Sequence, residues 1–167
     1  MTTKDLSLAI FLIGIAAVVA LSQQRAPIGA GDLTGIWRTG GQSMMADKNM
    51  ITGATTPSNG NTFKYMFTAD GRFEFVGYMQ STMYGCTTDL FNDKRGKYVL
   101  NGDQLTLSPT KNFWRNTYSC SPASNKERNY TLEQETMTLS GKTDEYGSQY
   151  ICLQGKSGET CYRRSKD

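Results

Sequence analysis

The clearest structural signal in this chain is the stretch Thr62-Phe63-Lys64-Tyr65-Met66-Phe67-Thr68-Ala69-Asp70-Gly71-Arg72-Phe73-Glu74-Phe75. Alternate side chains of a β-strand point to the same face, so Phe63, Tyr65 and Phe67 share one face of a strand. Gly71 supplies the left-handed backbone conformation that a short hairpin turn needs. The stretch therefore predicts an antiparallel hairpin made of strands 62–68 and 72–80.

Similar signals recur along the chain. Asn101-Gly102-Asp103 separates strands at 96–100 and 104–108, and Asn-Gly is the strongest short hairpin turn. Pro109 is expected to end the second of these strands. Further strands are expected at 34–39, around 82–90, at 128–132 and at 136–140, the last two joined by a turn at 133–135. Strands joined by tight turns pair antiparallel, so we predict an all-β, up-and-down barrel of about eight to ten strands.

The start of the chain carries an apolar run at residues 6–21. This run has the length of a signal-peptide core and is short for a membrane span. We therefore expect residues 1–20 to form a signal helix that is cleaved, with an uncleaved anchor as the alternative. Residues 21–32 are expected to be a linker, and residues 33–167 a single barrel domain in a secreted or periplasmic protein.

Four cysteines follow the apolar run, and an even number in an oxidising compartment predicts two disulfides. Folding the segment 149–164 about 155–158 brings Cys152 opposite Cys161, at a separation suited to a bridge. Cys86 then pairs with Cys120 by elimination. The alternative is a thiolate metal site, but the close cysteine pairs of zinc sites are missing and the chain has no histidine, so we expect no metal.

Composition narrows the range of functions. The formal net charge of +3 is too small to indicate a nucleic-acid partner. Without histidine, the usual general base and the Ser-His or Cys-His nucleophile pairs are missing, and clustered carboxylates fall in turns. We therefore expect no enzyme activity, no cofactor and no catalytic residues.

One motif resembles a known family. Gly35-Ile36-Trp37 in the expected first strand is similar to the Gly-x-Trp pattern of the lipocalin and calycin superfamily. The resemblance implies that Trp37 closes one end of a barrel and that an arginine at the end of the last strand, Arg163 or Arg164, packs across it. It also implies an interior cavity. The candidate cavity-facing residues are Phe67, Phe75, Tyr98 and Met137, whose alternative role is to fill the core.

Two functions follow from this reading. The first is an exported carrier or sensor that holds a small hydrophobic or amphipathic ligand in the barrel. The second is an exported protein-binding module, such as an inhibitor of an extracellular hydrolase, that acts through its loops. Two long loops are expected, at 40–61 and at 110–126, the latter fixed by Cys120. The second loop carries residue types that dominate protein interfaces, or alternatively folds back to cap the barrel: Phe113, Trp114, Arg115 and Tyr118.

Overall fold

The computed structural model describes residue 26 and residues 28–40, 47–48, 55–56 and 59–165. The expected signal helix at 1–20 lies outside these residues. In chain order the elements are α1 (Ala30–Leu33), β1 (Gly35–Thr39), β2 (Asp47–Lys48), β3 (Thr55–Thr56), β4 (Gly60–Phe67), β5 (Arg72–Met83), β6 (Cys86–Asn101), β7 (Gln104–Tyr118), the 3-10 turn η1 (Pro122–Ser124), β8 (Lys126–Asn129), β9 (Glu135–Thr143), β10 (Gln149–Gly155) and β11 (Gly158–Arg164). Within the described residues, no helix is long and apolar enough to cross a membrane.

Eight strands close into an antiparallel barrel. The order around the barrel is β1-β4-β5-β6-β7-β9-β10-β11, and β11 pairs back onto β1. Strands that follow one another in this order are also neighbours in sequence, apart from the insertions β2–β3 and β8. The predicted all-β, up-and-down barrel is therefore confirmed.

The hairpins follow the turn chemistry of the sequence. Phe63 to Phe67 of β4 pair with Gly77 to Phe73 of β5, and Gly71 in the turn has a φ of +78°. Gly102 has a φ of +62° in the turn between β6 and β7. The hairpins predicted on either side of Asp70-Gly71 and Asn101-Gly102 are both confirmed.

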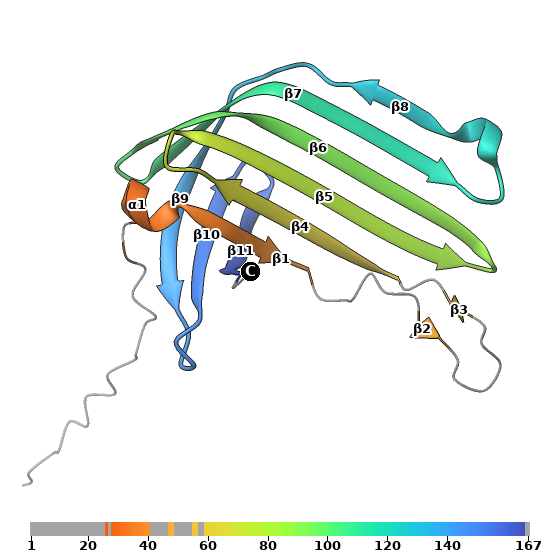
Figure 1. The fold of residues 1–167 in the computed structure, drawn as a ribbon, viewed down its shortest axis with the longest axis horizontal. Helices are drawn as coiled ribbons and strands as arrows, with labels where there is room; N and C mark the ends of the chain where they lie inside the picture. The colour runs from red at the N-terminus through yellow and green to blue at the C-terminus, as the bar shows by residue number, and fades with distance from the viewer. Residues whose placement is uncertain (1–25, 27, 41–46, 49–54, 57–58, 166–167) are drawn as a thin grey trace, which may run out of the picture.

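Three strands are much longer than the rest. β5, β6 and β7 contain 12, 16 and 15 residues, whereas β10 and β11 contain 7 each. At about 3.3 Å per residue, β6 spans about 50 Å. Figure 1 shows these strands lying side by side and running beyond the shorter strands, with β8 alongside. We call this projecting part the distal sheet: residues 78–83, 86–92, 112–118 and β8.

The expectation that Pro109 ends its strand is wrong, because β7 continues through Pro109 to Tyr118. The register between β6 and β7 shifts between Arg95 and Gly96, which marks a β-bulge at this point. Bulges tolerate a proline inside a sheet, since the regular hydrogen-bond ladder is already interrupted there. A Cβ atom on Gly96 would lie 2.2 Å from the Ser108 carbonyl oxygen, so this close backbone approach requires glycine.

Four further local expectations need correction. The single strand expected around 82–90 is instead the end of β5 and the start of β6, separated by a turn at Tyr84-Gly85, where both residues have positive φ. The strand expected at 136–140 is present in β9 and pairs with the cysteine hairpin, but the strand expected at 128–132 is shorter, as β8, and pairs with β7 and not with β9. The linker ends in a helical turn, α1, whose Leu33 is fully buried. The loop expected at 40–61 ends sooner than expected, as β4 begins at Gly60 and the segment contains the β2–β3 pair.

Both predicted disulfides are present. Cys152 and Cys161 are direct partners across β10 and β11. Cys86 and Cys120 are joined at the far end of the distal sheet, with a sequence separation of 34 residues.

Candidate functional site

The two ends of the barrel differ. β11 runs from Gly158 to Arg164, and β10 runs the opposite way. At the Arg164 end, α1 places Leu33 in the core and closes the barrel. At the Gly158 end, the Lys156-Ser157 turn borders a cavity of about 420 Å³. We call these the closed end and the mouth.

The closed end is built around Trp37. Its indole Nε1 donates a hydrogen bond of 2.7 Å to the Leu33 carbonyl oxygen, and the guanidinium carbon of Arg164 lies 4.5 Å from the ring centroid. Arg164 also donates to the carbonyl oxygen of Asp32. Gly35 leaves room for Arg164, because a Cβ atom at Gly35 would lie 3.4 Å from a guanidinium nitrogen. Of the two candidate arginines it is thus Arg164 that covers Trp37, while Arg163 bonds Ser148 at the surface.

The mouth cavity is formed by four strands, β4, β9, β10 and β11. Its wall combines buried apolar and aromatic side chains with acidic and polar residues at the rim. The described residues of the wall include Tyr65, Glu135, Met137, Leu153, Gly155 and Tyr162. The polar and apolar parts of this lining are similar in extent, so a cavity of this size can hold a small molecule that has both an apolar and a polar part.

Two tyrosines form the aromatic side of the mouth. The rings of Tyr65 and Tyr162 meet edge to face with centroids 5.1 Å apart, and Tyr65 also contacts Phe75 at 4.7 Å. Burial is the main reason that the pKa of Tyr65 is raised well above its ordinary value, and the nearby Tyr162 and Glu135 raise it further. Burial raises the pKa of Tyr162 to about 12. Both hydroxyls therefore keep their protons at neutral pH and can donate hydrogen bonds.

An ion pair lies beside these tyrosines. The Lys94 ammonium group of β6 donates to the Glu135 carboxylate of β9, across 41 residues of sequence. Only 14% of the Lys94 side chain is exposed, against 42% for Glu135. The mouth thus presents a fixed charge pair next to an aromatic wall, an arrangement that can orient a molecule with one apolar and one polar end.

The four residues expected to face a cavity divide into two groups. Phe67 and Tyr98 are buried in the core, where their rings pack edge to face at 5.1 Å, and they do not line the mouth. Phe75 packs against this core beside Tyr65, and Met137 lines the cavity itself. Sequence reasoning missed Lys94, although counting back in steps of two from inward-facing Tyr98 places it on the same face.

The aromatic loop expected at 110–126 is mainly a strand, which is a correction to the proposed binding loop. Phe113, Trp114, Arg115 and Tyr118 all lie on β7, and alternation separates them onto opposite faces. The ring centroids of Phe113 and Phe91 are 6.4 Å apart, and the guanidinium carbon of Arg115 lies 5.4 Å from the Phe91 ring centroid. On the other face, Trp114 meets the Tyr130 ring at 6.3 Å and the Arg128 guanidinium at 5.4 Å. These four residues therefore cannot act together as one loop surface.

A second cavity, of about 510 Å³, lies on the distal sheet. Among the described residues, all those that line it are uncharged. Among the described residues, Cys152, Glu159 and Cys161 lie close enough to share a metal ion. Both sulfur atoms are joined in a disulfide, however, so neither can serve as a thiolate ligand.

Comparison with known proteins gives no family assignment: no protein-family model matches the sequence, and no curated protein is significantly similar to it.

Proposed function

We propose that this chain is an exported, lipocalin-like barrel that binds a small hydrophobic or amphipathic molecule in the mouth. The observation that carries the proposal is the mouth cavity of about 420 Å³, with Met137 and Leu153 in its wall and the Lys94–Glu135 ion pair beside it. An apolar part of the ligand would lie against the wall, and its polar end would face the ion pair and the tyrosine hydroxyls. The role is binding rather than catalysis.

Two features support this reading. The closed end combines Gly35, Trp37 and Arg164 in the manner that the resemblance to lipocalins implies, so a ligand would enter the barrel from the mouth. The two disulfides are compatible with an extracellular or periplasmic location, where such carriers and sensors act.

A blocked mouth provides the sharpest test. Gly155 ends β10 with an ordinary backbone conformation, and a Cβ atom there would lie 3.6 Å from the Met137 side chain, which is normal contact. Gly155→Leu should therefore fill the cavity without straining the fold. Gln154→Leu is the matched control, because Gln154 is the adjacent residue of the same strand and is exposed.

The assay is titration with the fluorescent apolar probe N-phenyl-1-naphthylamine, together with native mass spectrometry of protein purified from its source. We expect a bound small molecule in the wild type, and probe affinity reduced about tenfold or more by Gly155→Leu but unchanged by Gln154→Leu. A wild-type protein that carries no ligand and does not bind the probe would refute the proposal. Equal probe binding by Gly155→Leu would show that the mouth is not the site.

A further inference from the structure

The far end of the distal sheet carries few charges. Residues 59–61, 78–88 and 116–125 contain no Asp, Glu, Lys or Arg, in a chain in which 20% of residues are charged. The charged residues that border these segments include Asp89, which accepts hydrogen bonds from Tyr78 and Thr117, and Lys126, which lies opposite Asn116 on β8. The structure brings these segments together, since β5 pairs with β4 and β6, and Thr88 of β6 pairs with Tyr118 of β7. We call this region the neutral tip. Depletion of charge together with exposed Tyr and Met is typical of the centre of a protein interface.

The neutral tip is held rigidly by uncharged groups. The Cys86–Cys120 disulfide links its two halves. The backbone N–H of Thr87 donates to the Ser119 hydroxyl at 2.7 Å, and the Ser119 N–H donates to the Thr87 carbonyl at 2.8 Å. The Asn59 side chain bonds the backbone N–H and carbonyl of Thr82 on the open edge of β5. A surface fixed in this way loses little conformational entropy when it binds.

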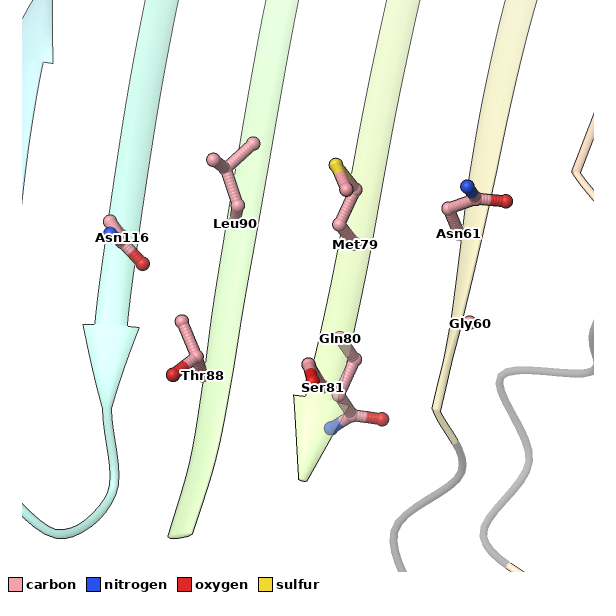
Figure 2. Close-up of a pocket in the computed structure, with 8 residues that line it drawn as sticks. All are labelled: Gly60, Asn61, Met79, Gln80, Ser81, Thr88, Leu90 and Asn116. Carbon is pink, nitrogen blue, oxygen red and sulfur yellow. The ribbon is translucent and has the colours of Figure 1, made fainter. Parts of the chain in front are cut away.

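The neutral tip carries both a projection and a recess. Met83 is 66% exposed and Tyr84 is 98% exposed, at the turn between β5 and β6. Tyr84 has a φ of +51°, which is uncommon for an aromatic residue and marks a conformation kept at a cost. Beside the turn is the groove of about 510 Å³. Figure 2 shows side chains from four neighbouring strands in a row across it: Asn61, Met79, Leu90 and Asn116.

The groove is suited to an entering tyrosine. Met79 and Leu90 supply apolar contacts, and Ser81 and Thr88 supply hydroxyl groups. The Oδ1 atom of Asn116 is buried and has no hydrogen-bond partner in the described part of the chain, so a hydroxyl entering the groove can satisfy it.

We propose that the neutral tip is a self-association surface, in which the Met83-Tyr84 projection of each copy enters the groove of a second copy about a two-fold axis. A two-fold contact places identical surfaces against each other, so charges within it would face like charges. The Met83-Tyr84 projection and the described residues of the groove carry no charge and so avoid that repulsion, and one surface carries both a projection and a recess. This inference concerns β4–β7 beyond the barrel and does not rest on the proposed binding of a ligand in the mouth.

Sedimentation velocity of the oxidised full chain, from about 1 µM to about 1 mM, tests the inference. The expected species is a dimer whose Kd hardly changes with salt, because no ion pair contributes. Tyr84→Asn should raise Kd about tenfold or more, as expected for an interface tyrosine, and asparagine tolerates positive φ, so the turn should fold. Met83→Lys should weaken the dimer further by placing like charges across the axis.

The matched control is Tyr146→Asn, since Tyr146 is 84% exposed in the turn between β9 and β10. It should leave Kd unchanged. A wild type that stays monomeric throughout would overturn the inference and leave the tip for a different partner. A dimer insensitive to Tyr84→Asn and Met83→Lys would place the interface elsewhere and overturn it equally, as would open-ended polymers in place of dimers.

Discussion

Removing the Cys86–Cys120 bridge provides a quantitative test of how the distal sheet is joined to the barrel. Both cysteines are exposed, so replacing them with alanine loses almost no packing and acts mainly on the unfolded chain. The sequence separation of 34 residues corresponds, in the loop-entropy relation, to about 3.8 kcal/mol at 25 °C. The Cys152–Cys161 bridge, with a separation of 9, corresponds to about 2.6 kcal/mol.

The full loss is expected in global stability only if barrel and distal sheet unfold together. β5, β6 and β7 run without a break from the core into the distal sheet, so we expect one cooperative transition. Urea unfolding followed by circular dichroism should show Cys86→Ala/Cys120→Ala less stable by about 3–4 kcal/mol, with the single variants equally affected because each removes the same bond. A loss below about 1 kcal/mol, or a separate early transition in the double variant, would refute this reasoning.

Three further predictions concern individual residues. Gly96→Ala should lower the free energy of unfolding in urea by about 1–3 kcal/mol or more, because the added Cβ would lie 2.2 Å from the Ser108 carbonyl oxygen. Gly31→Ala is the control and should not destabilise the protein, because the space around Gly31 is open. Equal stability of the two variants would contradict the close approach at Gly96. Arg164→Met should lower the free energy of unfolding by about 2–4 kcal/mol, because it removes the contact with Trp37 and the hydrogen bond to the Asp32 carbonyl oxygen. Arg164→Lys should be destabilised as well, because lysine lacks the planar group that stacks on Trp37. Full wild-type stability of Arg164→Lys would contradict the planar stacking. Burial of Asp93 acts to raise its pKa, but hydrogen bonds from Arg95 and Lys111 outweigh burial and hold the pKa below its ordinary value. The ionised Asp93 therefore stabilises the fold above about pH 4, and this contribution disappears as the pH falls through the lowered pKa. Asp93→Asn should accordingly cost about 1–3 kcal/mol at pH 7 and much less near pH 2; an equal cost at both pH values would exclude the charge as the cause.

Local sequence signals were sufficient for the hairpins because each depends on few residues. Gly71 and Gly102 fix their turns, and alternation around Tyr65 and Phe67 fixes the inward face of β4. The same holds for the bridge between Cys152 and Cys161, which needs only a short turn and correct register. The full lengths of β5, β6 and β7, which run beyond these hairpins, could not be predicted from such local signals.

The second half of β7 was missed because the bulge changes the alternation. Leu107 is opposite inward-facing Tyr98, but Asn112 is opposite inward-facing Lys94, so the inward positions change from odd to even numbers across Pro109. A prediction based on strict alternation therefore fails at Pro109. β8 was misplaced for a different reason: its four residues are all exposed, so no apolar alternation marks its partner.

Predicting which residues form the mouth requires long-range contacts that the sequence alone does not specify. Lys94 and Glu135 are far apart in the chain, and either could be a solvated surface charge until barrel closure brings β6 and β9 toward the same end. Closure also determines which inward aromatic residues fill the core, such as Phe67, and which border a cavity, such as Tyr65.

The inner face of the long strands runs from the barrel to the distal groove. On β5, Phe75 packs beside the mouth and Met79, two alternations further, lines the groove, so the two proposed sites share one wall. The substitutions that test them lie on different elements, Gly155 on β10 and Tyr84 in the β5–β6 turn. Measuring both probe binding and Kd in both variants therefore separates two cases. Independent sites give one changed readout per variant, whereas coupling through β5 would change both. In the wild type, coupling would also make the probe shift the dimer Kd by the same factor by which dimerisation shifts the affinity for the probe.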